Sequence, residues 1–402
     1  MEDWIRCNIG DVCKTISDTY RGDADNVVLV NTSDVLEGKC LNHQKSPNKD
    51  LKGQFKKTFQ KDDILYSEIR PANKRFAYID FDGTDYIAST KLMVIRHNDN
   101  IIPQFLYYII TSQAVIEELQ MLAESRSGTF PQITFSELAS LPIGLPPLPE
   151  QTKIVRLLKA LDDKIEVNRR INDNLEQQAQ YLFKSWFVDF DPFRDQLFVE
   201  SEMGMIPNGW SVTVLDELCS FISRGLTPKY DESSNELILG QTCVRNNIVT
   251  LDNARRHKPK QRTEKWVQQW DTLINSTGIG SLGRVGIVYF DMDNVAIDSH
   301  ITVIRPKSAL VRHYVGRNLL SRQPEIENMA VGSTGQTELP KERVKSLPIM
   351  LPDENALTRF NAIIEPIAYQ LYRNIEESRR LACLRDALLP RLMSGELTID
   401  DL

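Results

Sequence analysis

The chain has 402 residues, a length typical of two or three domains. Apolar residues make up 41% and charged residues 26%, as in ordinary globular proteins, which excludes disordered, collagen-like and highly charged chains. The formal net charge of −7 argues weakly against a uniformly basic nucleic-acid-binding protein, but it leaves local basic patches open.

Targeting and redox signals are missing from the sequence. No apolar run reaches ~18 residues, so no membrane span is expected. The start of the chain, MEDWI, lacks the basic residues and apolar stretch of a secretory signal. The cysteines have no C-x-x-C spacing, which favours free thiols over disulfides or a zinc site; they are Cys7, Cys13, Cys40, Cys219, Cys243 and Cys383. We therefore expect a cytoplasmic protein that does not associate with membranes.

The first segment in chain order, residues 1–149, is predicted to be rich in β-strands. Its apolar runs, such as residues 91–96 (KLMVIR), are short, contain β-branched and aromatic residues, and end at turn residues. A short amphipathic helix is expected near residues 103–122, and its counterpart in the second half near residues 311–329. A proline-rich connector at 145–149 (LPPLP) then leads into a long helix that begins at Glu150.

The second half of the chain repeats the first at an offset of about 206 residues. Residues 140–146 (SLPIGLP) recur as 346–352 (SLPIMLP), and Trp4 has a counterpart in Trp210. Further matches keep the same order. DIL at 63–65 with DTL at 271–273 and FD at 81–82 with FD at 290–291 drift by two or three residues, and SGT at 127–129 matches STG at 333–335 at the original offset. A duplication explains this series better than chance does.

Both long helices show the four-three spacing of a coiled-coil seam. The first seam is Ile154, Leu158, Leu161, Ile165, Asn168, Asn172, Leu175, Ala179, Leu182 and Trp186. The second is Phe360, Ile364, Ile367, Leu371, Asn374, Ser378, Leu381, Arg385, Leu388 and Leu392. Both have polar residues at the same place, which would fix the register of an antiparallel pair. Alternatively, these faces pack on their own β-domain or contact solvent. Pro366 is expected to kink or restart the second helix.

These patterns predict an α+β fold. Two tandem, pseudo-symmetric β-rich domains at residues 1–149 and 191–353 are joined by two long helices, at 150–190 and within 354–402, that form an antiparallel coiled coil. Such a pair would be related by an approximate two-fold axis, with the domains at opposite ends of a rod.

The sequence contains no complete motif for catalysis or cofactor binding. Residues 278–283 (GIGSLG) match G-x-G-x-x-G, but a β pattern follows them where a dinucleotide site needs a helix, so a hairpin or bulge is favoured. P-loop, G-x-S-x-G and H-E-x-x-H motifs are missing, as is the NPPY-type tetrapeptide of DNA amino-methyltransferases. We expect no enzymatic activity and no cofactor.

The histidines show no metal-ligand spacing; they are His43, His97, His257, His300 and His313. The run Asp298-Ser299-His300 has the residue types of a catalytic triad, but the matching residues 88–90 (AST) lack both the acid and the histidine. A structural or DNA-facing role is therefore favoured for His300.

Basic residues gather at comparable points of the two β-rich domains and favour phosphate binding over the alternative of a solvated charged loop. The first cluster is Lys45, Lys49, Lys52, Lys56, Lys57 and Lys61, and the second is Arg255, Arg256, His257, Lys258, Lys260, Arg262 and Lys265. Other side chains suited to reading base edges or holding DNA are Arg70, Asn73, Lys74, Arg75, Thr129, Gln132, Arg224, Gln241, Arg245, Asn275, Arg284, His300 and Gln336.

The chain resembles the specificity subunits of type I restriction–modification systems. The resemblance is carried by residues 145–151 (LPPLPEQ), 182–190 (LFKSWFVDF) and 384–397 (LRDALLPRLMSGEL), and it extends over nearly the whole chain. It implies two target-recognition domains that each read half of a bipartite site in double-stranded DNA. The helices would be the spacer and the docking surface for two methyltransferase subunits, with restriction (translocase and nuclease) subunits joining. S-adenosylmethionine, ATP and metal chemistry would belong to these partners.

The two recognition domains are expected to read different bases, since TFPQ at 129–132 stands where the second half has GQTE at 335–338. Three alternatives remain at this point. The chain could be the specificity component of a system whose partner combines methylation and cleavage. It could be a coiled-coil protein–protein scaffold, or a nucleotide-binding enzyme that uses the Gly278 loop.

Overall fold

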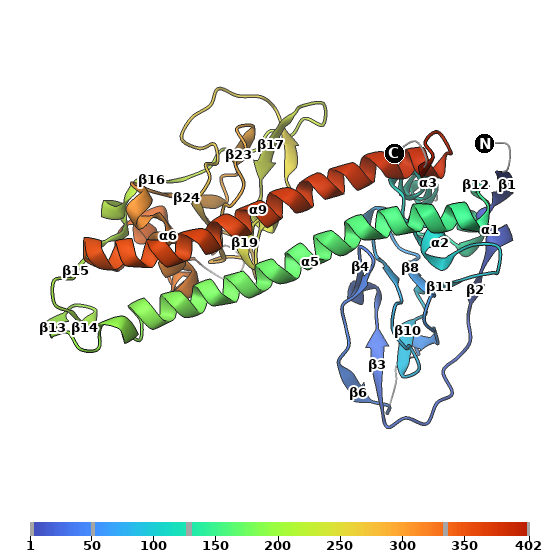
Figure 1. The fold of residues 1–402 in the computed structure, drawn as a ribbon, viewed down its shortest axis with the longest axis horizontal. Helices are drawn as coiled ribbons and strands as arrows, with labels where there is room; N and C mark the ends of the chain where they lie inside the picture. The colour runs from blue at the N-terminus through green and yellow to red at the C-terminus, as the bar shows by residue number, and fades with distance from the viewer. Residues whose placement is uncertain (1–3, 50–52, 126–130, 333–336, 400–402) are drawn as a thin grey trace. The chain divides into compact units, whose positions relative to one another are not determined.

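The computed structural model describes residues 4–49, 53–125, 131–332 and 337–399. The chain forms two compact units, one of residues 1–164 with 380–402 and the other of residues 165–379. Both boundaries fall inside the long helices α5 (Leu148–Phe187) and α9 (Glu354–Met393), drawn in green and red in Figure 1. Each unit therefore consists of one β-rich domain and one part of each helix.

The first unit contains two four-stranded sheets, ordered β6-β3-β10-β7 and β2-β11-β8-β9, and the two-stranded pairs β1-β12 and β4-β5. Its strands are β1 (Ile5–Asn8), β2 (Cys13–Ile16), β3 (Asn26–Val30), β4 (Val35–Leu36), β5 (Lys39–Cys40), β6 (Lys45–Pro47), β7 (Phe55–Lys57), β8 (Ile64–Ser67), β9 (Phe76–Tyr78), β10 (Tyr86–Ser89), β11 (Leu92–His97) and β12 (Pro142–Leu145). Its short helices are α1 (Ile9–Val12), α2 (Pro103–Ile110), α3 (Gln113–Glu124) and α4 (Phe135–Ala139).

The second unit contains a six-stranded sheet, β16-β24-β21-β22-β19-β18, a three-stranded sheet, β20-β17-β23, and the pairs β13-β14 and β15-β25. Its strands are β13 (Phe198–Ser201), β14 (Gly204–Pro207), β15 (Ser211–Val214), β16 (Cys219–Arg224), β17 (Glu236–Leu239), β18 (Val244–Arg245), β19 (Asn247–Val249), β20 (Arg255–His257), β21 (Thr272–Asn275), β22 (Val285–Ile287), β23 (Val295–Ile297), β24 (Ile301–Pro306) and β25 (Pro348–Leu351). Its short helices are α6 (Ala309–Ser321), α7 (Gln323–Asn328) and α8 (Lys341–Lys345).

Strand pairing confirms the internal repeat. Ile5 lies opposite Leu145 in the β1–β12 pair, and Ser211 lies opposite Leu351 in the β15–β25 pair, so both partners are displaced by the 206 residues seen in the sequence. The parallel pairs β3–β10 and β17–β23 also correspond, with an offset of 209. The orders β6-β3-β10 and β2-β11-β8-β9 of the first domain therefore recur as β20-β17-β23 and β16-β24-β21-β22 in the second, where β18 and β19 extend the larger sheet. The drift in offset arises in the loops between the strands.

A buried ion pair occurs at the same place in both repeats. In the first, the guanidinium of Arg96 on β11 donates two hydrogen bonds of 2.7 Å to Asp63, directly before β8. In the second, Arg305 on β24 donates to both oxygens of Asp271, directly before β21, at 2.8 and 2.7 Å. Both carboxylates are buried and also accept a backbone N–H, which keeps their charges compensated. The matching DIL and DTL triplets of the sequence thus mark a shared structural element.

The ends of the long helices belong to the two domain cores. Ile154 and Leu158 from α5, with Leu388 and Leu392 from α9, join the core of the first unit. Residues of the second unit's core from these helices are Ala179, Phe183, Trp186, Phe187, Ala356, Leu357, Phe360 and Ile364. At both ends, the interpretation that the apolar faces pack on their own β-domain is therefore correct.

Between these ends, the two helices pair antiparallel through polar contacts. Asn168 donates to Ser378 at 3.3 Å, and Asn374 donates to Asn172 at 2.8 Å. In the first unit Arg385 donates to Asp162 at 2.7 Å. Residue numbers rise along α5 as they fall along α9, so the polar positions expected to set the register do face one another.

Helix α9 runs without interruption through Pro366, so the expectation of a restart there is wrong. Two of the short helices expected from the sequence are also divided differently. The segments near 103–122 and 311–329 each form two helices, α2 with α3 and α6 with α7.

A buried charged network ties α5 to the second β-rich domain. Arg317 on α6 donates to Glu176 on α5 at 2.6 Å and to the hydroxyl of Tyr289 at 2.5 Å. His313 lies one helical turn before Arg317 and is also buried. Burial, together with the positive charges of Arg312 and Arg317, lowers the pKa of His313 to about 3.

The lowered pKa of His313 predicts that this residue makes the folding stability of the protein sensitive to acid. Below pH ~6.5 the unfolded chain protonates His313 while the folded chain does not, so folding stability is lost as the pH falls. Between pH 7.5 and 5 the wild-type protein should lose about 2 kcal/mol more stability than His313→Gln, at ~1.4 kcal/mol per pH unit below the ordinary pKa. Denaturant unfolding of both proteins at each pH measures this difference. Parallel pH profiles would contradict it.

Candidate nucleic-acid interface

Two basic edge strands occupy the same position in the two repeats. In the first, β6 pairs antiparallel with β3 and places Lys45 opposite Val28. In the second, β20 pairs antiparallel with β17 and places Arg256 opposite Leu237. Val28 and Leu237 correspond through their own parallel partners, so Lys45 and Arg256 are equivalent positions. Lys45 of the first cluster and Arg256 of the second therefore lie on the same element of the duplicated fold, whereas Lys56 and Lys57 lie on β7, at the other edge of the first sheet.

The two repeats also have equivalent hairpin loops. The loop between β8 and β9 carries Arg70, Asn73, Lys74 and Arg75, and the loop between β21 and β22 contains the glycine-rich run at 278–283. The three glycines of that run have positive φ values of 97°, 71° and 81°. No helix begins inside this loop, so it is the hairpin expected from the sequence and lacks the geometry of a dinucleotide site.

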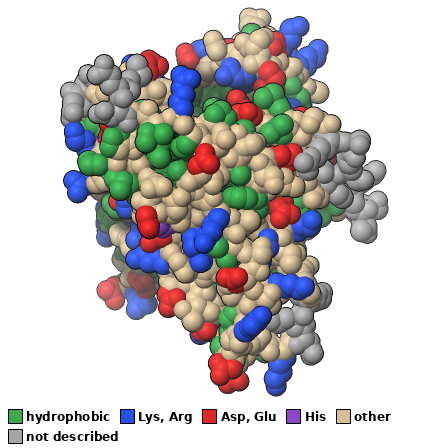
Figure 2. All heavy atoms as spheres, turned by 90° about the vertical axis from the view of Figure 1, so that its right-hand side faces the viewer, with side chains coloured by type: hydrophobic (Ala, Val, Ile, Leu, Met, Phe, Trp, Pro, Cys, Tyr) green, Lys and Arg blue, Asp and Glu red, His purple; other side chains and the backbone are tan. Residues whose placement is uncertain are grey.

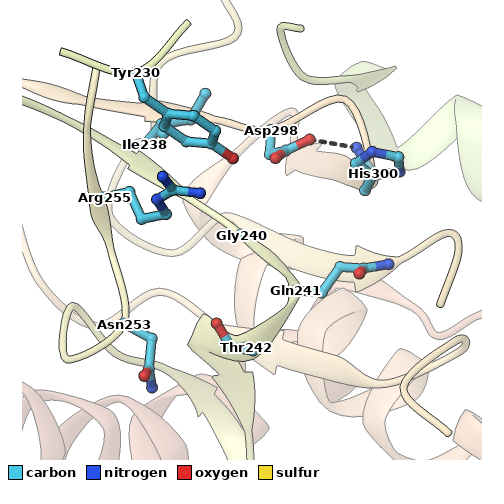
Figure 3. Close-up of a pocket in the computed structure, with 9 residues that line it drawn as sticks. All are labelled: Tyr230, Ile238, Gly240, Gln241, Thr242, Asn253, Arg255, Asp298 and His300. Carbon is cyan, nitrogen blue, oxygen red and sulfur yellow. Dashed lines mark hydrogen bonds between the residues drawn. The ribbon is translucent and has the colours of Figure 1, made fainter. Parts of the chain in front are cut away.

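A pocket of about 260 Å³ lies beside the edge strand β20 in the second unit (Figure 3). Its lining residues are Tyr230, Ile238, Gly240, Gln241, Thr242, Asn253, Arg255, Asp298 and His300. Arg255 comes from β20, and its guanidinium carbon lies 3.4 Å from the centre of the Tyr230 ring. Stacking of this kind holds the long arginine side chain in place. The pocket thus presents fixed donors and acceptors at the surface.

Thr277, in the loop after β21, contacts two residues that line the pocket. Its hydroxyl lies 2.8 Å from Nε2 of Gln241 and 2.9 Å from Nδ1 of His300. Buried Asn275 donates to the backbone oxygen of Gln241 at 3.0 Å. Gln241 and His300 are therefore positioned by the hairpin that follows β21, and they are held before any ligand arrives.

The arrangement around His300 is not that of a catalytic triad. Asp298 accepts a hydrogen bond from the backbone N–H of His300 at 2.9 Å and one from the hydroxyl of Ser299 at 3.2 Å (Figure 3). In a triad the acid orients the imidazole and the imidazole contacts the nucleophile. Here the acid fixes the turn, and the ring of His300 contacts Thr277.

The predicted DNA-binding residues differ in solvent exposure. Those with exposed side chains are Lys45, Lys49, Lys56, Arg70, Asn73, Arg245, Arg255, Arg256, Lys258, Lys260, Arg262 and His300. Those that are partly buried are Lys57, Lys74, Arg75, Gln132, Arg224, Gln241 and Arg284. Lys52, Thr129 and Gln336 lie outside the described residues.

Several predicted residues already have protein partners. Lys57 donates to the backbone oxygen of Leu92 at 2.8 Å, and Arg224 forms a 2.8 Å ion pair with Glu338. Asn275, expected from its side-chain type to contact DNA, is completely buried and donates to the backbone oxygen of Gln241. His257 of the second basic cluster is also buried, and its imidazole contacts the backbone of Lys229.

Surface charge alone does not define the interface. On the face shown in Figure 2, Lys and Arg side chains are interspersed with Asp and Glu. Within the described residues, no group of three or more His, Cys, Asp or Glu side chains could hold a metal ion. The six cysteines, all in described ranges, carry free thiols. Among the helices of the described ranges, none has the length and apolar character needed to span a bilayer.

Sequence reasoning missed four residues of the second repeat: Tyr230, Thr242, Asn253 and Thr277. They belong to no motif, and only folding brings Tyr230, Thr242 and Asn253 to one pocket and places Thr277 beside its residues Gln241 and His300. The stacking of Arg255 on Tyr230 had no signal in the sequence, because it depends on an antiparallel bridge between Tyr230 and His257 of β20, residues 27 positions apart.

Comparison with known proteins defines the class. The model of the type I restriction modification DNA specificity domain matches residues 1–177 and 207–377, two segments that begin 206 residues apart. These segments cover most of the chain and coincide with the two structural repeats. The chain therefore belongs to the family of type I restriction–modification specificity subunits.

Individual relatives agree with this assignment. The chain is 32% identical to the type I restriction enzyme HindI specificity subunit of Haemophilus influenzae, over 99% of this chain and 100% of the relative. It is 29% identical to the MjaIX specificity subunit of Methanocaldococcus jannaschii, over 76% of this chain and 71% of that protein. The crystal structure of a type I S subunit from M. genitalium has 16% identity and a TM-score of 0.51 over 97% of this chain and 96% of that one, which supports the fold.

Proposed function

We propose that this specificity subunit binds double-stranded DNA and reads a bipartite sequence, one half-site with each β-rich domain. The observation that carries the proposal is the equivalence of the edge strands β6 and β20, which place the basic residues Lys45 and Arg256 at the same position of the two repeats. Lysine and arginine on such strands would neutralise phosphates, while Gln241, Arg255 and His300 suit base edges.

The two half-sites should differ in sequence. The position of Gln241, at the start of a 3₁₀ helix after β17, is taken in the first repeat by Thr32 after β3. His300, directly before β24, corresponds by strand register to Lys91, directly before β11, so the match of 298–300 with 88–90 taken from the sequence is shifted by one residue. Equivalent backbone positions thus carry different hydrogen-bonding groups, and these groups decide which base pair is accepted.

Catalysis is proposed to belong to partner subunits. The family implies two methyltransferase subunits and restriction subunits that assemble on this chain in the cytoplasm, and that supply all cofactor and metal chemistry. The groups around His300 support a non-catalytic role, because its imidazole is bonded to Thr277 and Asp298 bonds a backbone N–H.

We further propose that the paired helices α5 and α9 set the spacing between the half-sites. Inserting four residues into both helices, directly after Asn172 in α5 and directly before its bonded partner Asn374 in α9, adds ~6 Å to each. The recognised spacer should then lengthen by about one or two base pairs while both half-sites stay unchanged. Sequencing of the methylated sites reads this directly. An altered half-site with an unaltered spacer would contradict the role of the helices.

The function as a whole is tested by the methylome of cells that express this chain with its methyltransferase, compared with cells that lack this chain. We expect a motif of two short half-sites with a fixed gap, methylated only when the chain is present. Unchanged methylation, with the methyltransferase expressed and bound to the chain, would refute the proposal and favour the scaffold alternative.

A further inference from the structure

An exposed isoleucine, Ile279, lies at the tip of the β21–β22 hairpin. Ile279 stands between Gly278 and Gly280, both with positive φ, and 89% of its side chain is exposed. Single exposed apolar residues are common on protein surfaces and need no explanation by themselves. What distinguishes Ile279 is the rigidity of the loop that carries it and the identity of its neighbours.

The loop is held by its own hydrogen bonds. The backbone oxygen of Gly278 accepts from the N–H of Leu282 at 2.9 Å, and the oxygen of Gly280 accepts from the guanidinium of Arg284 at 2.6 Å. At the base of the loop, Gly283 lies so close to helix α7 that an added Cβ would be 2.7 Å from the Cα of Glu327. The exposed side chain is therefore carried by a constrained turn.

The neighbours of this tip are the side chains assigned to base recognition. Thr277, two residues before Ile279, is bonded to both Gln241 and His300. Gln241 also touches the start of the tip, since a Cβ on Gly278 would lie 2.7 Å from its Nε2. Arg284 supplies a positive charge on the other side of the loop. An apolar protrusion is thus surrounded by groups that suit phosphates and base edges.

The first repeat does not have this feature. Its equivalent loop, between β8 and β9, is closed by the 3₁₀ helix Pro71–Asn73, and Pro71 is buried. The exposed apolar tip therefore belongs to the second recognition domain only, and it is not a requirement of the shared fold.

Resting on the DNA-binding function proposed above, we propose that Ile279 is an apolar wedge that inserts between two stacked bases of the second half-site. Proteins that open a base step use Ile, Leu, Met, Phe or Pro in this way, flanked by polar and cationic contacts. The unstacking free energy is offset by contacts of the surrounding residues, so specificity would include the ease with which that step opens.

The test uses the full chain co-purified with its methyltransferase and a duplex that carries the site found in the methylome. A fluorescent base, 2-aminopurine or pyrrolo-dC, replaces each position of the second half-site in turn. The wild-type complex should increase fluorescence several-fold at one step. Ile279→Ser should abolish this increase and bind the site on the order of tenfold more weakly, whereas Ile279→Leu should behave as the wild type. Because Ile279 packs on nothing, neither variant should change the melting temperature.

Rescue provides a second readout. A mismatch at the opened step lowers the cost of unstacking, so it should restore much of the affinity of Ile279→Ser. Site-specific binding with no brightened position and no loss in Ile279→Ser would overturn the wedge while leaving the DNA-binding function intact. Failure of the wild-type complex to prefer the site over a scrambled duplex would overturn both.

Discussion

Replacing Arg305 by methionine is expected to destabilise the second β-rich domain by about 3–5 kcal/mol. Arg305 and Asp271 are both buried, and the arginine also donates to the backbone oxygen of Trp266 at 2.9 Å. Methionine fills similar space but leaves the Asp271 carboxylate buried without a counter-charge. The free energy lost is mainly the cost of that uncompensated charge.

The duplication provides a matched control for this prediction. Arg96→Met breaks the equivalent pair of the first repeat, where 24% of the arginine side chain is exposed and water can reach the site, so its effect should be clearly smaller. Native-state hydrogen exchange of the β21 and β8 amides reports on each repeat separately. Equal losses in the two variants would show that burial does not govern the strength of these pairs.

Removing the charges of one edge strand should weaken DNA binding for one half-site only. The triple alanine variant of Arg255, Lys258 and Lys260 is expected to lose on the order of 100-fold in affinity and to reduce the salt dependence of binding by about 0.9 for each phosphate contact removed. Alanine at Lys45, Lys49 and Lys56 is the matched variant of the first repeat. These six side chains are exposed, so stability should change little.

Duplexes with one scrambled half-site separate the two variants. With the half-site of the first domain scrambled, the remaining specific binding should disappear in the β20 variant and persist in the variant of the first cluster. With the other half-site scrambled, the outcome should be reversed. Identical behaviour of both variants on both duplexes would mean that these lysines and arginines act through the overall charge of the chain and do not contact particular half-sites.

The polar positions of the helices show how far pattern alone could go. Asn168, Asn172, Asn374 and Ser378 stand out in the sequence because they interrupt an apolar seam, and in the structure they are bonded to one another. The ends of the same seams could not be assigned in advance, because an apolar helical face fits a partner helix and a β-domain equally well. Tertiary packing placed them in the domain cores.

The presence of basic residues at the candidate interface could be predicted from the sequence, but the burial and the partners of individual residues could not. Basic residues at similar points of two repeats indicated phosphate binding, yet no local pattern indicated that Asn275 and His257 would be buried. It also did not show that Lys57 would donate to a backbone oxygen. Burial of a polar side chain depends on strand order and on neighbouring sheets, which are properties of contacts between distant residues.

The sequence by itself determined the duplication, the hairpin character of the 278–283 loop, the polar register of the paired helices and the resemblance to specificity subunits, since each depends on local spacing or on repetition along the chain. Only the tertiary structure decided that β6 and β20 are equivalent edges, that Tyr230 stacks on Arg255, and that Thr277 joins Gln241 to His300. The physical reason is that sheet pairing brings together residues tens of positions apart, and no local pattern in the chain specifies which strands become neighbours.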